Sequence, residues 1–135
     1  MALVEPSRYR LPGERYGKNH HVVITSVEEK EPGVNSLKRT DMYITANHYP
    51  DGSPAEVFCS IDQAGSRVGS LVDAWCTAVS VSLQYGIPLK TFTSKARGTC
   101  YEPSGFTSNP KIPKASSPLD YLARWLEKLY GLEEA

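Results

Sequence analysis

Apolar residues recur at helical spacing between residues 65 and 86, the longest such pattern in the chain. The stripe comprises Val68, Leu71, Val72, Trp75, Val79 and Leu83. Spacings of three and four residues place them on one side of a helix. Ser66 can cap the start of this helix, Gly86 can end it, and Pro88 prevents it from restarting. We therefore expect a long helix on which the other elements pack.

A second amphipathic helix is predicted near the C-terminus. Ser117 is a good helix cap, Pro118 suits the first helical position, and Asp120 follows three residues after the cap. The apolar face of this helix comprises Leu119, Leu122, Leu126 and Leu129. Gly131 is expected to end it. A shorter helix over residues 88–95 is expected between the two.

Alternation and β-branched residues predict strands in the first half of the chain. The predicted strands are residues 18–27, 41–49 and 55–61. Asp51-Gly52 predicts a tight hairpin turn, since this pair tolerates positive φ. Residues 28–40, which are charged and contain Pro32-Gly33, are expected to form a loop. Residues 97–117 are expected to form a long irregular connection of the kind that often carries function.

These elements predict an α+β fold, in which an antiparallel β-sheet of three or more strands packs against two main helices as a two-layer sandwich. The 135 residues suffice for one domain with a single core. Residues 1–17, rich in Arg, Pro and Gly, are expected to form an extended arm, and residues 18–135 the domain. Ile44 and Tyr43 place apolar side chains on both faces of the sheet. We therefore expect a second copy to cover the exposed face or edge.

The charge balance and the cysteines narrow the class of protein. Fifteen basic residues balance fifteen acidic residues, which argues against a protein that wraps duplex DNA. No apolar run reaches the length of roughly 18 residues that a membrane helix needs, and the N-terminus has no signal-peptide core. The three widely spaced cysteines, Cys59, Cys76 and Cys100, fit a reducing cytoplasm better than a disulfide framework. We expect a cytoplasmic protein that binds neither DNA nor a membrane.

The best candidates for ligand binding lie in and after the long connection. They are Arg97, Tyr101, Asn109 and Arg124. Arginine side chains neutralise phosphates through forked hydrogen bonds, tyrosine stacks on a nucleobase, and asparagine reads a base edge. Arg67, in the glycine-rich start of the long helix, is expected near the phosphates. In the structural alternative, Arg97 forms a salt bridge with Glu102 and Tyr101 fills the core.

Other reactive side chains do not form a recognisable pattern. His20, His21 and His48 lack Cys, Asp or Glu neighbours at ligand spacing, so no metal site is expected. Asp73 is expected to lie on the polar face of the long helix. The sequence contains no Ser-His-Asp, Cys-His or paired-carboxylate arrangement. We therefore expect neither catalysis nor a cofactor.

Three segments of the sequence resemble one family. The segments are residues 51–89, 96–112 and 116–126, and residues 8–17 resemble the segment that precedes them. They are similar to the TSCPD domain near the C-terminus of cobalamin-dependent (class II) ribonucleotide reductases. In that family the radical chemistry, the cobalamin and the catalytic cysteines belong to a large barrel. The resemblance therefore implies a free-standing relative without reductase activity. Residues 28–40 depart from the family, because this segment is longer and more charged.

The size and layout also resemble the Thoeris anti-defence 1 family of phage proteins. That resemblance implies a non-catalytic sponge that sequesters cyclic ADP-ribose-type or cyclic oligonucleotide signals in the host cytoplasm. It implies a homodimer or a larger assembly such as a hexamer, with Arg97, Tyr101, Asn109, Arg124 and Arg67 on the ligand. The first alternative is an accessory or regulatory subunit of a ribonucleotide reductase. The second is a structural remnant without a ligand.

Overall fold

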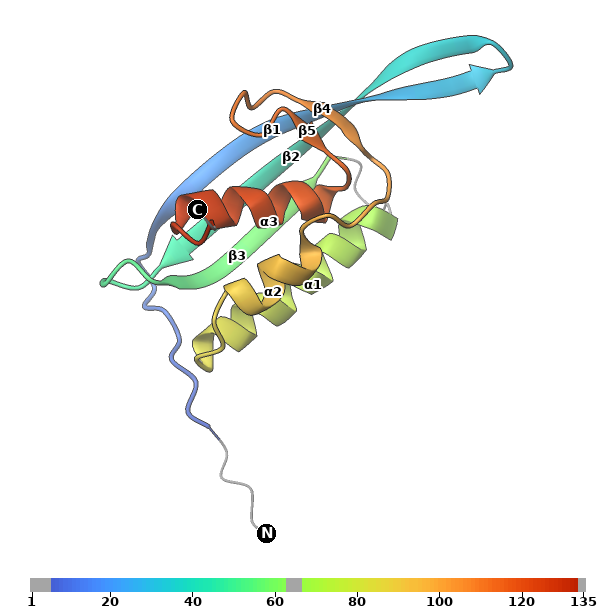
Figure 1. Cartoon of the computed structure of the whole chain (residues 1–135). Coiled ribbons are helices and arrows are strands. Elements are labelled where there is room, and N and C mark those ends of the chain that lie inside the picture. Colours follow the sequence, from blue (N-terminus) through green and yellow to red (C-terminus); the bar gives the residue numbers. More distant parts are fainter. Residues whose placement is uncertain (1–5, 63–66, 134–135) are drawn as a thin grey trace.

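The computed structural model describes residues 6–62 and 67–133. The strands are β1 (Tyr16–Glu31), β2 (Val34–His48), β3 (Pro54–Ile61), β4 (Gly105–Thr107) and β5 (Lys114–Ala115), and the helices are α1 (Arg67–Gln84), α2 (Lys90–Ala96) and α3 (Pro118–Leu129). The strands form one antiparallel sheet in the order β3-β2-β1-β4-β5. The helices cover one face of this sheet (Figure 1). The predicted α+β architecture is confirmed.

The core lies between the helices and the even-numbered residues of β1 and β2. Its fully buried members include Val22, Ile24, Met42, Ile44, Val72, Val79, Tyr121, Leu122 and Leu126. Side chains alternate along a strand, so the odd-numbered residues point to the opposite face. Tyr43 of β2 and Phe58 of β3 lie on that face and are 48% and 42% exposed. The sheet therefore has one covered face and one open face.

The predicted stripe of α1 needs one correction. Leu71 is 71% exposed, whereas it was expected in the core. The buried positions of α1 are Val72, Cys76, Val79, Ser80, Leu83 and Gln84. Two of these residues, Ser80 and Gln84, are polar. The side of α1 that is buried therefore differs from the side that hydrophobicity alone indicates. Gly86 has a φ of 92°, as expected of a residue that ends a helix, while the predicted cap Ser66 lies outside the described residues.

The two buried polar side chains of α1 cover the outer edge of β3. The Ser80 hydroxyl accepts a hydrogen bond from the Val57 N–H (2.9 Å) and donates one to the Val57 carbonyl (3.0 Å). The Gln84 amide nitrogen donates to the Ala55 carbonyl (3.2 Å). Exposed strand edges offer such groups to other chains. The helix α1 thus closes one edge of the sheet as well as packing against its face.

Residues 28–40 do not form the predicted loop. The strands β1 and β2 stay paired out to Glu31 and Val34, with an irregularity between Glu29 and Glu31. They turn tightly at Pro32-Gly33, where Gly33 has a φ of 80°. They form a two-stranded ribbon that projects beyond the sheet (Figure 1). The prediction was wrong because a ribbon with solvent on both sides needs no apolar alternation, and its charges resemble those of a loop.

The long connection and the arm also differ in detail from the predictions. Residues 97–117 contain β4 and β5, which extend the sheet beyond β1. The arm lies against the domain, since the Tyr9 N–H donates to the Gln84 carbonyl (2.8 Å) and Arg15 pairs with Glu56 (2.7 Å). It passes into β1 at Tyr16, slightly earlier than expected.

We predict that Ser80→Ala lowers the free energy of unfolding by about 1–3 kcal/mol, because it leaves the Val57 N–H and carbonyl buried without a partner. Urea denaturation followed by circular dichroism measures the change. Ser82→Ala is the matched control, since the Ser82 hydroxyl bonds the Ala78 carbonyl of the same helix (2.7 Å) and its loss should cost under about 0.5 kcal/mol. Equal losses in the two variants would contradict the role of Ser80 at the edge.

Candidate functional site

Two buried carboxylates on one side of α3 organise the junction between α2 and α3. Asp120 is 4% exposed and Glu127 is 1% exposed. They are seven residues apart, which is close to two turns, so both project from the same side of the helix. Buried carboxylates require hydrogen-bonding partners to offset the loss of water. Each of these two finds its partners in a different part of the chain.

Asp120 fixes the residues that precede α3 and those that follow α2. Its carboxylate accepts hydrogen bonds from the backbone N–H groups of Gly98 (2.8 Å) and Ser116 (3.1 Å) and from Arg124 Nη1 (3.1 Å). Burial acts to raise the pKa of Asp120, but these hydrogen bonds and the Arg124 charge outweigh burial and lower it. The predicted cap is confirmed, since the Ser117 hydroxyl accepts from the Asp120 N–H (2.9 Å).

Glu127 fixes α2 itself. Its carboxylate accepts hydrogen bonds from the Thr93 hydroxyl (3.2 Å) and from Arg97 Nη1 (3.1 Å). The structural alternative, in which Arg97 pairs with Glu102, named the wrong partner: the carboxylate that pairs with Arg97 comes from α3, thirty residues along the chain. Sequence reasoning missed Glu127 because an acid on a predicted amphipathic helix is normally solvated.

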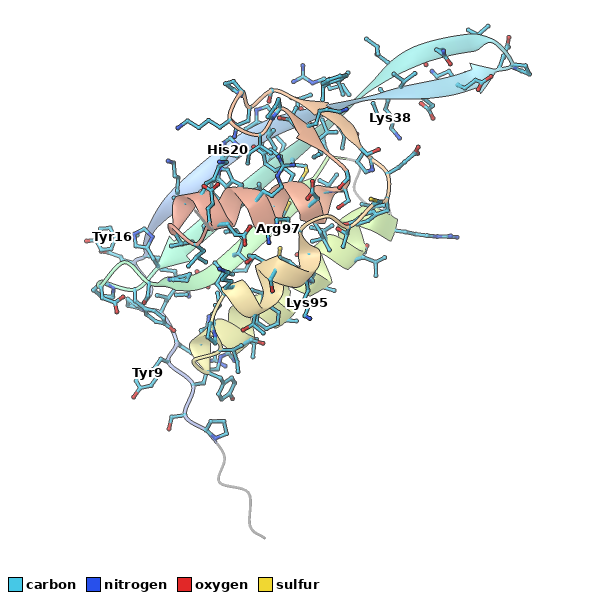
Figure 2. The ribbon with its side chains drawn as sticks, viewed as in Figure 1. Tyr9, Tyr16, His20, Lys38, Lys95 and Arg97 are labelled. Carbon is cyan, nitrogen blue, oxygen red and sulfur yellow. The ribbon has the colours of Figure 1, made fainter. Side chains whose placement is uncertain are left out.

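The two anchored arginines, Arg97 and Arg124, line the same cleft. The cleft has a volume of about 600 Å³ and is also lined by Gly98, Ser104, Gly105, Lys114, Ala115, Ser116 and Asp120. A smaller hollow of about 260 Å³ adjoins both arginines and adds Lys111, Lys128 and the acids Glu127 and Glu133. Figure 2 shows Arg97 where α2 ends beside α3. We use the name arginine cleft for the larger of these two hollows.

The electrostatics of the arginine cleft favour an anion. Within the described residues each guanidinium engages its partners through Nη1, which leaves the donors at Nε and Nη2. Arg97 and Arg124 side chains are 42% and 32% exposed, whereas their carboxylate partners are buried. Asp120 and Glu127 contribute to the walls but are almost inaccessible, so the guanidinium groups are the more exposed members of the two ion pairs. Guanidinium groups held in this way are pre-organised for phosphate or carboxylate.

The other predicted ligand residues lie outside the arginine cleft. The Tyr101 hydroxyl is half-buried and accepts from the Leu119 N–H (3.3 Å), and burial raises its pKa. The Asn109 side chain donates to the Tyr121 hydroxyl (3.0 Å) and accepts from the Lys111 N–H (3.0 Å). Arg67 is exposed at the start of α1 and is not among the residues that line the cleft. The structure thus brings together two of the five predicted residues.

A second polar cluster was not foreseen. His20 Nε2 lies 2.7 Å from the Tyr121 hydroxyl, and the His20 ring stacks on Trp125 at 5.1 Å between centroids. Burial, followed by the charges of Lys18 and His21, lowers the pKa of His20. Asn109 completes the cluster through its bond to Tyr121. The spacing of these residues along the chain, from β1 to α3, carried no signal that they would meet.

An apolar cavity lies at the C-terminal end of α1. It has a volume of about 600 Å³, and its lining includes Tyr9, Tyr49, Leu83, Ile87, Leu89 and Leu132. The arm crosses it, because the Tyr49 hydroxyl donates to the Tyr9 carbonyl (2.6 Å). None of the predicted ligand residues is among its lining residues.

The histidines do not gather with other metal ligands in the part of the chain that the structure describes, where no group of three or more His, Cys, Asp or Glu side chains is placed to hold an ion. His21 lies 3.6 Å from Asp41 and stacks on Tyr43. None of the described helices combines the length and the hydrophobicity that a bilayer span requires.

Comparison with known proteins agrees with the family resemblance. The family model of the TSCPD domain matches residues 10–130 of the chain. The chain is 38% identical to the vitamin B12-dependent ribonucleotide reductase of Rhodopirellula baltica over 92% of its own length, which is 11% of that protein. It is 38% identical to the enzyme of Streptomyces coelicolor over 90% of the chain and 11% of that protein. It is 34% identical to the enzyme of Bradyrhizobium diazoefficiens over 95% of the chain and 9% of that protein. The chain thus spans about a tenth of the length of these relatives. No solved structure matches it.

We predict that Asp120→Asn destabilises the protein by about 1–3 kcal/mol near pH 7, because hydrogen bonds to a charged acceptor are weakened. The pKa of Asp120 is lowered on folding from the ordinary value of 3.8. The extra stability is therefore present above pH 3.8 and is lost as the pH falls through the lower folded pKa. Urea titrations from pH 7 to pH 3 should show the two proteins converging at the acid end.

The matched control for this prediction is Asp73→Asn on the exposed side of α1. Its unfolding free energy should stay within about 0.5 kcal/mol of the wild type. A gap between wild type and Asp120→Asn that stayed constant down to pH 3 would contradict the role assigned to the ionised carboxylate.

Proposed function

This chain belongs to the TSCPD domain family, and from that membership we propose that it serves a B12-dependent ribonucleotide reductase as an accessory or regulatory domain. The observation that carries the proposal is the extent of the match. It runs over 92% of the chain at 38% identity to a reductase, and the family match includes residues 10–17 of the arm. Residues that build the arginine cleft fall within the matched range 10–130. We infer that the domain binds rather than reacts.

The burial of the thiols supports a binding role. Burial, and to a lesser extent the charge of Asp73, raises the pKa of the Cys59 thiol to about 12. Burial likewise raises the pKa of Cys76. The thiolate is the reactive form of cysteine, so both groups are inert near neutral pH. Among the described residues, Cys100 is the exposed thiol.

The arginine cleft is the part of the domain that we propose to bind a nucleotide. Nucleotide phosphates are anions that suit two guanidinium groups with outward donors. Gly98 and Gly105, which have no side chain, form part of the wall and allow close approach of a ligand. A regulatory domain of a nucleotide-reducing enzyme needs a site that senses a nucleotide but performs no reaction. The cleft meets that need on charge and size.

We predict that the purified chain forms a complex with a B12-dependent reductase at micromolar concentration and changes its turnover. Analytical ultracentrifugation with the Streptomyces coelicolor enzyme, followed by reductase assays with and without the chain, measures both effects. Bovine serum albumin at equal mass is the control for non-specific effects. The accessory role is wrong if neither a complex nor a change in rate is observed.

A second candidate function is sequestration of a cyclic ADP-ribose-type signal. The observation that favours it is that Arg97 and Arg124 share one cleft, as a ligand with two phosphates would require. Tyr101 and Asn109 lie outside the cleft and hold neighbouring backbone and side-chain groups. On this hypothesis the base would lie against other residues than those expected from the sequence.

We predict that Arg97→Lys weakens nucleotide binding by roughly ten- to a hundredfold, because lysine keeps the charge beside Glu127 but loses the guanidinium fork. Isothermal titration calorimetry with cyclic ADP-ribose and with ATP distinguishes the two functions: the sponge should prefer the former and release it unchanged on heating. Lys95→Arg, on an exposed residue of α2, is the control and should bind as the wild type does. Unaltered affinity in Arg97→Lys would place the nucleotide outside the arginine cleft.

A further inference from the structure

A polar hollow lies where the ribbon of β1 and β2 leaves the sheet. It has a volume of about 450 Å³, and its lining comes from β1, β2, the end of β3, the start of α1 and the connection after α2. Figure 2 shows Lys38, one of the lining residues, at this place. The hollow shares no lining residue with the arginine cleft. We call it the ribbon hollow.

The depth of the ribbon hollow follows from the alternation of the strands. Ser26 and Lys38 are directly paired and have even numbers, so they lie on the same face of the sheet as the core residues of β1 and β2. Thr40 and Ile61 are the buried lining residues, at 3% and 9% exposure, whereas Glu102 is exposed. The hollow therefore continues the covered face of the sheet beyond the core, with Thr40 and Ile61 at its deep end.

Thr40 carries a buried polar group that the chain leaves without a partner. Its hydroxyl forms no hydrogen bond within the described residues, whereas most buried polar side chains in proteins are paired. Valine has almost the same shape and would fill this position without burying an unpaired hydroxyl. Rotation about the Cα–Cβ bond of Thr40 exchanges its hydroxyl and methyl groups, so the hydroxyl can turn to a molecule in the hollow. Such a molecule accounts for a threonine at this position.

The charge around the ribbon hollow is predominantly negative. The carboxylates of Glu28, Glu29 and Glu102 outnumber the ammonium group of Lys38. Glu29 also accepts a hydrogen bond from the Gly33 N–H (3.0 Å) at the turn. Within the described residues, the side chains of Glu28, Glu102 and Lys38 form no ion pair or hydrogen bond. The hollow therefore favours a cation, and two of its carboxylates are free to bind one.

A single metal ion does not fit this arrangement. Calcium and magnesium take several oxygen ligands within about 2.6 Å, and no group of three or more His, Cys, Asp or Glu side chains among the described residues is placed to hold an ion. The carboxylates of Glu28 and Glu102 come from different parts of the chain, β1 and the connection before β4. Apolar side chains complete the lining: Val27, Ile61, Val68 and Pro103. Such a surface suits a cation whose charges are separated by an alkyl chain.

We propose that the ribbon hollow binds a small aliphatic diamine or polyamine. One ammonium group pairs with Glu28 and another with Glu102, and the alkyl chain between them packs on the apolar part of the lining. Thr40 offers its hydroxyl oxygen as an acceptor at the deep end. A lysine side chain of a protein partner has the same chemistry but carries a single ammonium group, which leaves one of the two carboxylates unpaired.

The first test is isothermal titration calorimetry of the full-length chain with 1,4-diaminobutane and with spermidine. Both should bind at one site in about 0.15 M salt, where attraction between distant exposed charges is largely screened. Butylamine and Nα-acetyl-lysine amide, each with one ammonium group, should bind at least about tenfold more weakly, because one charge-assisted hydrogen bond is lost. This inference does not rest on the proposed function, since the ribbon hollow and the arginine cleft are separate sites.

Three results of this titration would overturn the proposal. Acetyl-lysine amide that binds as tightly as diaminobutane would assign the hollow to a lysine of a protein partner. Mg²⁺ that binds as tightly would show attraction to negative charge without selection of an amine. The absence of binding at about 5 mM diaminobutane would leave the hollow without the proposed ligand.

The second test locates the site through substitutions with effects of opposite sign. Glu102→Gln should weaken diaminobutane binding by roughly ten- to a hundredfold, because a charged acceptor is lost. Lys38→Met should strengthen binding, because it removes the competing cation. Glu31→Gln, on the same ribbon but outside the lining, is the matched control and should bind as the wild type does. Reversed signs would indicate an anion site and overturn the proposal, as would equal losses in Glu102→Gln and Glu31→Gln.

The third test addresses the buried hydroxyl alone. Without ligand, Thr40→Val should melt at the same temperature as the wild type or higher, because no hydrogen bond is lost. Its affinity for diaminobutane should nevertheless fall about tenfold. A purely structural role of Thr40 would lower the melting temperature and leave the affinity unchanged. Unchanged affinity in a folded Thr40→Val variant therefore overturns the assignment of the amine to the ribbon hollow.

Discussion

The arrangement of the helices depends on the burial of two carboxylates on one side of α3. Asp120 and Glu127 are almost inaccessible to water, so their hydrogen bonds must be made by the protein. Asp120 takes backbone N–H groups from the two ends of the long connection, and Glu127 takes side chains from α2. Removing either acceptor would leave donors without a partner at the centre of the junction. The position of α2 against α3 follows from this requirement.

The same requirement produces the arginine cleft. A buried carboxylate without a nearby cation is costly, and Arg97 and Arg124 supply the compensating charges. Because the acids are buried more deeply than the arginines, the structural ion pairs have their positive ends toward solvent. The structural interpretation of Arg97 and the functional one are therefore compatible. A residue can stabilise the fold through one nitrogen and present the remaining donors to a ligand.

Much of the fold could be predicted from local patterns, and the errors share a physical cause. The start of α3 at Ser117 and the turn at Gly86 were correct, since both depend on neighbouring residues. Leu71 was misplaced and Glu127 was overlooked, because hydrophobicity describes the average preference of a side chain, whereas burial depends on which partners the fold supplies. The ribbon over residues 28–40 was missed since its pairing is not reinforced by a core.

The candidate site was harder to predict than the fold, because it is formed by contacts between distant segments. Arg97 and Arg124 were chosen for their chemistry, and the structure places them on one cleft. Tyr101 and Asn109 were chosen on the same grounds, yet each is engaged in holding the connection between α2 and α3. Sequence spacing cannot separate these roles, because both place a polar side chain in a loop.

The two polar residues within the apolar stripe of α1 show what such exceptions can mean. Ser80 and Gln84 are one turn apart and satisfy alternate backbone groups of β3, Val57 and Ala55. A helix that only packed on the sheet face would gain more from apolar residues at these positions. Their presence is explained by a strand edge that must be closed. Among the residues that the structure describes, no strand pairs with Gly17–His21 on the side away from β2, so the two edges of the sheet differ in how they are closed.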